Sequence, residues 1–287
     1  PVMDWVLEPQ APWSWCAPRA LPGASAAFGT SFSHALEQPP RLAIGCGRQG
    51  ALATRLLRQR GSTSVQILDP RIDPRHWDLV IAPEHDGLVG DNVITLVGSL
   101  NPVDTLWLAQ ARAAFASFAD LPQPRTAVLL GGPSAHARFD LAAFEALASQ
   151  LDAALAHEGG SVMVTTSRRT PTDVIAALRK RYVETPNVVW CGDADGINPY
   201  PGMLAWADRI VASPDSVNML SEACATDVPV FVFDPDRVSG RPRRFLDALL
   251  ARRRIRRMDT TLASFPVEPL RETARIAALV KQRLSLA

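Results

Sequence analysis

The stretch DRIVASPDSVNMLSEACATDVPVFVFD (208–234) holds two short apolar runs, RIVA (209–212) and PVFVFD (229–234). The runs are rich in β-branched and aromatic residues, as in buried strands. The segment between them, SVNMLSEACA (216–225), has the apolar spacing of a helix and begins with residues that cap helices. Two strands joined by a crossover helix are the unit from which parallel sheets are built. This stretch therefore predicts an α/β protein with a parallel sheet.

The same alternation of apolar runs and helical stretches recurs along most of the chain. We expect strands at 41–47, 64–69, 78–83, 92–98, 126–132, 161–167, 187–192, 208–213 and 229–234. We expect helices near 49–60, 103–119, 138–157, 171–182, 216–225, 243–253 and 267–286. The pattern is typical of Rossmann-like, doubly wound parallel sheets.

A polar stretch with two prolines, DLPQPR (120–125), interrupts this alternation and resembles a linker. We therefore predict an N-terminal Rossmann-like domain at 1–122, a second one at 123–266, and a helix at 267–287 that packs back on the first. The two domains are expected to face a cleft. The first 40 residues are rich in Pro and Trp and receive no assignment.

The composition excludes several classes of protein. The chain has 287 residues, of which 47% are hydrophobic and 21% charged, and its formal net charge is +1, so a globally basic nucleic-acid binder is not expected. It has neither a long uncharged apolar run nor a basic start followed by an apolar segment. Four scattered cysteines without metal or redox spacing favour a reducing compartment. We expect a cytoplasmic protein, and the Arg and Ala bias favours a bacterial source.

Ligands of doubly wound sheets bind beyond the carboxyl ends of the strands, so the loops that leave strands are the candidate sites. GGPSAH (131–136) contributes Gly131, Gly132 and Ser134, whose backbone amides could approach a ligand closely. A tight turn explains the glycine pair equally well.

Two further loops carry groups suited to a nucleotide. Ser167, Arg168 and Arg169 follow a strand, and paired arginines there can clamp a phosphate, although exposed arginine pairs are commonly only solvated. Asn198 and Tyr200 follow the next strand and form either a turn or the edge of a base pocket.

The loop SPDS before the helix at 216–225 is the fourth candidate. Its Ser213, Asp215 and Ser216 are all good helix caps, and the first amides of the helix could bind a phosphate. Glu222 lies among small and apolar residues, so its carboxylate could accept hydrogen bonds from a ribose; the alternative is a simple cap with Glu222 in water. The helix residues included in this candidate site are Asn218, Met219, Ser221 and Glu222.

Several longer motifs resemble one known family. LDPRIDPRHWDLVIAPEHDG, LLGGPSAH, VTTSRRTP, NPYPGMLAWADRIVASPDSVNMLSEA and DVPVFVF are similar, in order, to segments of the family named for a plant mitochondrial-fission protein. The resemblance implies a GT-B glycosyltransferase-like fold in which the second domain binds the nucleotide sugar and the first binds the acceptor. Matched by motif, the resemblance marks Gly131, Gly132, Ser167, Arg168, Arg169, Asn198, Tyr200, Ser213, Asp215, Ser216, Ser221 and Glu222. The family's usual first strand and G-x-x-G-x-x-x-Q loop are not found, so we expect the N-terminal domain to lack them.

The acceptor chemistry is expected in PEHDG (83–87), which follows an apolar run and contains Glu84, His85 and Asp86. Inverting glycosyl transfer needs one general base near the acceptor hydroxyl, and we assign Asp86 or His85 to this role. A polar turn in which His85 pairs with a carboxylate is an equal alternative. The five histidines show no metal-ligand spacing, so we expect no metal and no cofactor besides the nucleotide-diphosphate sugar donor.

Residues 237–257 contain nine arginines, which form either a solvated helix face and strand edge or a peripheral contact with an anionic membrane. Together the observations favour a hexosyltransferase-type enzyme whose acceptor is a lipid-linked or cell-envelope glycan, located in the cytoplasm or at the inner face of the membrane. The alternative is a non-catalytic GT-B-like scaffold that recruits a dynamin-like protein partner, as the plant relative implies.

Overall fold

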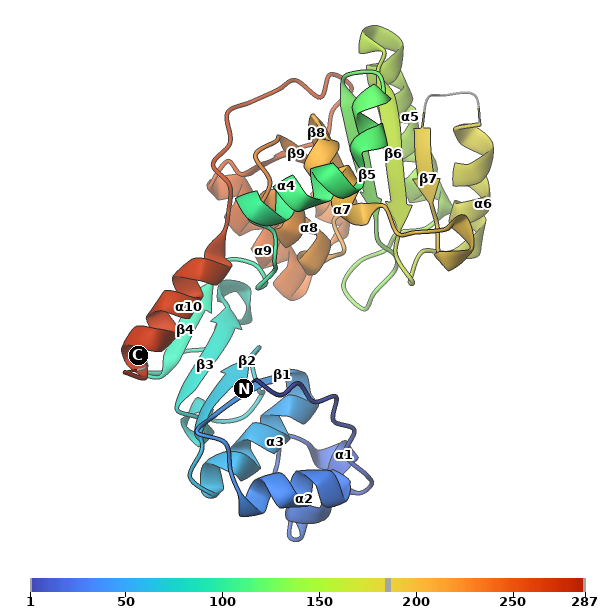
Figure 1. Ribbon diagram of the computed structural model, residues 1–287. Helices are drawn as coiled ribbons and strands as arrows, with labels where there is room; N and C mark the ends of the chain where they lie inside the picture. Colours follow the sequence, from blue (N-terminus) through green and yellow to red (C-terminus); the bar gives the residue numbers. More distant parts are fainter. Residues whose placement is uncertain (1, 184–186, 286–287) are drawn as a thin grey trace. The chain divides into compact units, whose positions relative to one another are not determined.

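The computed structural model describes residues 2–183 and 187–285, which form two compact units (Figure 1). Unit 1 comprises the described residues as far as Leu96 and from Ile276 onward, and unit 2 comprises Val97–Arg275. Each unit contains one parallel β-sheet. The prediction of an α/β protein with two Rossmann-like parallel-sheet units is confirmed.

The division between the units lies earlier than the linker-like stretch at 120–125. Helix α4 (Thr105–Ala114) belongs to unit 2 because it packs on helix α7 (Tyr200–Trp206). The Nε atom of Arg112 donates a hydrogen bond to the Ala205 carbonyl at 2.7 Å. Local composition identified a proline-rich turn here, whereas packing between segments far apart in sequence sets the boundary.

Unit 1 has four parallel strands in the order β1-β2-β3-β4. They are β1 (Leu42–Cys46), β2 (Thr63–Ile67), β3 (Leu79–Pro83) and β4 (Val93–Leu96). Helix α3 (Gly47–Gln59) crosses from β1 to β2 and buries an apolar stripe that includes Leu52 and Leu56.

The first 40 residues, which received no assignment, contain three short helical segments. These are α1 (Trp13–Cys16), the 3-10 turn η1 (Ala24–Ala26) and α2 (Gly29–Glu37). Phe32 and Leu36 of α2 share a buried cluster with Leu52 and Leu56 of α3, so this region adds to the core of unit 1.

Unit 2 has six parallel strands in the order β10-β9-β8-β5-β6-β7. They are β5 (Arg125–Leu130), β6 (Ser161–Thr166), β7 (Asn187–Trp190), β8 (Arg209–Ala212), β9 (Val230–Val232) and β10 (Ile255–Arg257). Read from β7, the order is third, second, first, fourth, fifth and sixth along the chain, which is the Rossmann order. The chain therefore reverses direction across the sheet between β5 and β8.

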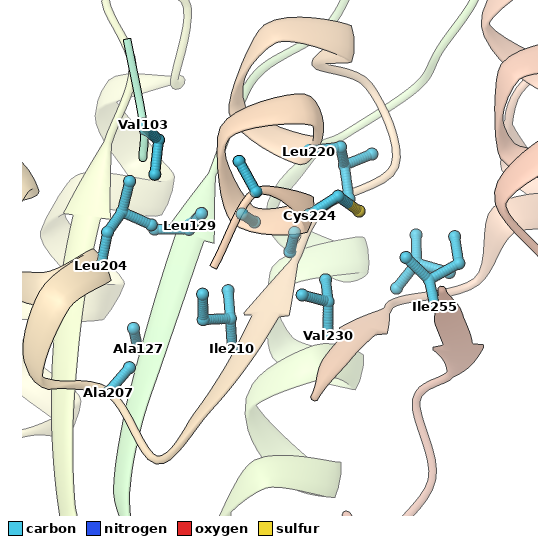
Figure 2. Close-up of a cluster of buried hydrophobic side chains, with 14 of the residues drawn as sticks. Val103, Ala127, Leu129, Leu204, Ala207, Ile210, Leu220, Cys224, Val230 and Ile255 are labelled. Carbon is cyan, nitrogen blue, oxygen red and sulfur yellow. The ribbon is translucent and has the colours of Figure 1, made fainter. Parts of the chain in front are cut away.

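Both faces of this sheet are covered by helices. Ala127 and Leu129 of β5 face one buried cluster, which α4, α7, α8 (Val217–Cys224) and α9 (Gly240–Ala251) complete (Figure 2). Val128 and Leu130 face the other, with α5 (Leu141–Glu158) and α6 (Thr172–Arg181). Because neighbouring residues of a strand point to opposite faces, a strand covered on both sides is apolar at consecutive positions, as β5 is from Ala127 to Leu130.

Three local features differ from the sequence predictions. Strand β10 was not predicted because only Ile255 of its three residues is buried, and charged residues are common on edge strands. Helix α7 begins at Tyr200, where a loop was expected. The last helix, α10 (Glu272–Arg283), begins five residues later than predicted, and the predicted end at residue 286 lies outside the described residues.

Most arginines of segment 237–257 are exposed or partly exposed on α9, in the turn after it and on the edge strand β10, whereas Arg254 is buried and donates to the Cys224 carbonyl at 2.9 Å. Arg243 and Arg257 both contact Asp236, each with one nitrogen to oxygen distance of 2.6 Å. Hydrogen bonds from these arginines hold the pKa of Asp236 at about 2. Part of the positive charge of this segment is therefore paired within the chain.

Candidate functional site

The carboxyl edge of the unit 2 sheet is the natural place for a ligand, because the loops after β5 and β8 leave the sheet on opposite sides of the strand-order reversal. All of the residues predicted to bind the nucleotide sugar lie in unit 2, in loops and helices that follow its strands. They divide into a group that bonds within the protein and a group that remains accessible.

The first group joins the loops after β5 and β8. The Gly131 amide donates to the Ser213 hydroxyl and the Gly132 amide to the Asp215 carboxylate, both at 2.8 Å. Ser213 donates in turn to Asp215 at 2.6 Å. Both glycine amides are therefore bonded within the protein, as the tight-turn alternative allows, and a contact between this loop and a ligand stays a prediction.

The glycines are nevertheless required at this place. A Cβ atom on Gly131 would lie 2.0 Å from an Asp215 carboxylate oxygen, and one on Gly132 would lie 2.1 Å from the Arg169 carbonyl oxygen. The close approach predicted for a ligand is thus made by other loops of the protein itself.

The loop after β6 bonds to both of these loops and completes the network. We call the bonded residues of the three loops the inner network: Gly131, Gly132, Ser167, Arg169, Thr170, Ser213 and Asp215. Thr170, which the sequence analysis missed, donates to the Gly131 carbonyl at 2.5 Å and accepts from the Ser167 amide at 3.0 Å. Arg169 contacts the fully buried Asp215 carboxylate at 3.1 Å while 44% of its own side chain remains exposed. Its Nη1 atom donates to the Gly132 and Pro133 carbonyls at 3.3 and 3.4 Å, so both terminal nitrogens bond within the protein although the side chain is partly exposed at the rim of the site.

The start of helix α8 is more open. Its cap is Ser216, whose hydroxyl accepts from the Met219 amide at 3.4 Å; the alternative caps Ser213 and Asp215 belong to the inner network instead. Within the described chain, the amides of Val217 and Asn218 have no hydrogen-bond acceptor, as expected for the first turn of a helix. These two amides are available to an anion.

Glu222 lies on the same helix and contacts Tyr200. The Tyr200 hydroxyl donates to the Glu222 carboxylate at 2.5 Å, and both side chains are partly buried. Burial raises the pKa of Glu222, and the hydrogen bond from Tyr200 opposes this shift. Burial, with a contribution from Glu222, raises the pKa of Tyr200 well above its ordinary value. Two predicted residues 22 positions apart in sequence are thus brought together.

The remaining predicted residues have different surroundings. Ser221 is buried and accepts from the Ser99 amide at 3.0 Å, so it fixes the chain after β4, and its role as a nucleotide contact stays a prediction. Ser134 is exposed and accepts from the His136 amide. Asn198 is exposed and its side chain accepts from the Tyr200 amide at 3.0 Å. The residues left accessible at this edge are Arg168, Arg169, Asn198, Tyr200, Ser216, Asn218, Met219 and Glu222.

The predicted catalytic residues Glu84, His85 and Asp86 form a 3-10 turn, η3, directly after β3 in unit 1. Glu84 is exposed, whereas the other two are partly buried. The Asp86 carboxylate contacts Arg71 at 3.4 Å, and Arg71 also pairs with Asp69 at 2.8 Å. The loops after β2 and β3 therefore meet in a charged cluster, which is consistent with the polar-turn interpretation and leaves the catalytic assignment a prediction.

A family model described as Mitochondrial fission ELM1 matches residues 1–284 of this chain. The chain belongs to the mitochondrial fission ELM1 family. The Mitochondrial fission protein ELM1 of Arabidopsis thaliana is 30% identical over 277 residues, which cover 86% of this chain and 64% of that relative. An uncharacterized protein of Rickettsia prowazekii is 24% identical over 288 residues, which cover 86% of this chain and 81% of that relative.

This ELM1-family chain also resembles solved structures. The UDP-bound structure of S. aureus MnaA matches 89% of this chain and 79% of its own, with 11% identity and a TM-score of 0.48.

One glycine-rich turn of this ELM1-family chain escaped the sequence analysis. GCGRQG (45–50) spans the end of β1 and the start of α3, and it has the spacing G-x-G-x-x-G rather than the G-x-x-G-x-x-x-Q expected from the family resemblance. A Cβ on Gly45 would lie 2.6 Å from the Gly50 carbonyl oxygen, and Gly47 has a φ of +72°. The signal that could have identified it is a G-x-G-x-x-G directly after an apolar run.

Residues 2–183 and 187–285 of this ELM1-family chain contain no cluster of three or more His, Cys, Asp or Glu side chains placed to hold a metal ion. Likewise, no helix of this part of the chain is both long and apolar enough to cross a membrane.

Proposed function

We propose that the chain binds a nucleotide-diphosphate sugar at the carboxyl edge of the unit 2 sheet and transfers the sugar to an acceptor, as a GT-B-like glycosyltransferase. The observation on which the proposal rests is Glu222, which accepts a hydrogen bond from Tyr200 of α7 and lies on α8, the helix whose two first-turn amides are free. This combination offers an anion site and a carboxylate acceptor within one short helix.

The diphosphate would lie against the Val217 and Asn218 amides. A helix terminus contributes about 1 to 2 kcal/mol to an anion in a favourable site, whereas millimolar to micromolar binding needs about 4 to 8 kcal/mol. Arg168 is exposed and, in the described chain, has no ion-pair partner, and 44% of the Arg169 side chain is exposed beside it. These two guanidinium groups are suited to supply the remaining charge without a metal ion.

The nucleoside would contact the other end of the accessible region. A ribose hydroxyl can donate to Glu222 and replace the hydrogen bond that Tyr200 now makes. The Tyr200 ring and the exposed Asn198 would then border the base. Ionised Glu222 is needed for this contact, so its raised pKa makes nucleotide affinity sensitive to pH.

In the transfer step, the acceptor hydroxyl attacks the anomeric carbon, loses its proton to a base and displaces the nucleoside diphosphate, with inversion. We assign the base to Asp86 or His85, beside Glu84, on the loop after β3 of unit 1. A lipid-linked or cell-envelope glycan remains our proposal for the acceptor, with a peripheral membrane contact through the exposed arginines of α9.

A non-catalytic scaffold that binds a protein partner is the second candidate. It is favoured by the inner network, because the Gly131 and Gly132 amides that a donor cradle would use are already bonded to Ser213 and Asp215. The name of the Arabidopsis relative, a mitochondrial fission protein, is compatible with such a role.

Thermal unfolding with a panel of UDP, GDP, CMP and their sugars separates the two candidates. A ligand at 100 times its Kd should raise the free energy of unfolding by about 2.7 kcal/mol. Arg168→Ala should reduce this response strongly, and Arg19→Ala, which removes another exposed arginine, should not. If no nucleotide stabilises the chain, the donor site is refuted and the scaffold is favoured.

A further inference from the structure

A second polar cavity lies in unit 1, at the opposite edge of its sheet from the η3 turn. It has a volume of about 470 Å³ and is lined by the end of α3, the residues that lead into β2, and the segment before β3. The lining residues used below are Arg55, Arg58, Thr63, His76 and Asp78. Pockets of this volume accommodate small molecules.

The one carboxylate in the wall of the cavity is fully occupied. Asp78 accepts from the Arg58 Nε and Nη2 atoms, each at 3.0 Å, and from the Ser64 amide and hydroxyl at 2.8 and 2.9 Å. These four hydrogen bonds use its acceptor positions and also neutralise Arg58. Asp78 is thus not available to balance another charge.

Arg55 has no such partner in the described part of the chain. Its Nη1 atom donates to the Pro18 carbonyl at 3.2 Å, and its buried Nε–H has no acceptor there. A partly buried guanidinium without a counter-charge is costly, and burial accordingly lowers the pKa of Arg55.

His76 also lies close to the positive charges of Arg55 and Arg58. Burial lowers the pKa of His76, Arg55 and Arg58 lower it further, and only Asp73 acts in the opposite direction. At neutral pH the imidazole is therefore a neutral hydrogen-bond partner beside an unbalanced arginine.

We infer that this cavity binds a phosphate group, carried by a small soluble phosphate monoester, through Arg55 with a hydrogen bond from His76. A phosphate would supply the missing counter-charge, and arginine is the preferred partner for phosphate oxygens. The site is independent of the nucleotide site proposed above, because all of its residues belong to unit 1.

The test is calorimetric titration of the full chain with inorganic phosphate and with glycerol phosphate at constant ionic strength. We expect saturable binding that Arg55→Gln weakens at least about tenfold. Arg60→Gln is the matched control, because Arg60 is exposed at the end of the same helix and does not line the cavity.

Because Arg55 also contacts the Pro18 carbonyl, a second variant tests the site without removing that bond. Thr63→Glu places a carboxylate at the cavity wall and should abolish phosphate binding, with an unaltered far-ultraviolet circular dichroism spectrum. Vesicles of phosphatidylcholine with phosphatidic acid form the second arm: binding to vesicles but not to soluble phosphates overturns the assignment to a soluble ligand. Absence of saturable binding, or binding that Arg55→Gln does not change, overturns the site itself.

Discussion

Two regions share the carboxyl edge of the unit 2 sheet and contain similar residue types, but they differ in what their polar groups contact. In the inner network, serine, threonine, aspartate and glycine amides bond to each other, and Ser213 and Asp215 are buried. Around α8, the Val217 and Asn218 amides are open and Glu222 makes one hydrogen bond, to Tyr200.

The difference shows that a polar residue after a strand is not by itself a ligand contact. Buried polar groups must be hydrogen-bonded, and short side chains on neighbouring loops satisfy the nearest backbone amides. A group is available to a ligand only where the fold leaves it without such a neighbour. The following three changes test this distinction.

The largest effect is expected for Asp215→Ala, in the inner network. The substitution leaves the buried Gly132 amide and Ser213 hydroxyl without their acceptor and Arg169 without its counter-ion. We expect the free energy of unfolding, measured by urea denaturation, to fall by about 3 kcal/mol. The control Ser134→Ala, in the exposed part of the loop after β5, should change it by less than about 0.5 kcal/mol.

If Asp215→Ala were instead as stable as the wild type but unable to bind nucleotide, Asp215 would be a ligand contact and the inner network would not be structural.

An intermediate effect, on binding, is expected for Glu222→Gln. Loss of a charged acceptor should weaken nucleotide affinity about tenfold or more, by calorimetry, because hydrogen bonds to charged groups contribute about 1.5 to 3 kcal/mol. Nucleotide affinity of the wild type should also fall as the pH is lowered through the raised pKa of Glu222.

Stability should depend on pH in the opposite sense. The folded chain binds the Glu222 proton more tightly than the unfolded chain, because the folded pKa is raised. This contribution to stability is present below the ordinary glutamate pKa and is lost as the pH rises through the raised value. Glu222→Gln should remove that part of the pH dependence; an identical profile in wild type and variant would show that the Glu222 pKa is not raised.

The smallest effect is expected for Ser216→Ala at the start of α8. Its hydroxyl accepts a long hydrogen bond of 3.4 Å from the Met219 amide, so loss of the cap should cost about 0.5 to 1 kcal/mol in urea denaturation. Ser216→Asp keeps a cap but adds a negative charge beside the free amides. It should therefore retain stability and lose nucleotide affinity, and unaltered affinity would place the phosphates elsewhere.

The sequence allowed most of the fold to be predicted. Strand β5 is apolar from Ala127 to Leu130, and such runs are recognised locally because they reflect burial on both faces of a sheet. Strand β10 was not predicted, because its Arg256 and Arg257 are exposed and give no apolar run. The position of the boundary between the units was not predicted either, because it depends on the packing of α4 against α7, which leaves no local pattern in the sequence.

The candidate site was predicted less completely, and for a related reason. Ser216 and Glu222 could be identified because a helix start and a lone acid among small residues are local patterns. The hydrogen bonds of Gly131 and Gly132 could not be predicted, because their partners Ser213 and Asp215 lie 82 and 83 residues further along the chain.

The sequence by itself thus determined the alternation of strands and helices, the parallel sheets and the loops where ligands can bind, because these follow from residue spacing and burial. Only the tertiary structure decided which polar groups remain available, because hydrogen bonding at the edge of the sheet depends on which loops the strand order brings side by side. The strand order places the loop after β5 beside the loop after β8, and their short side chains then satisfy one another while the start of α8 stays open.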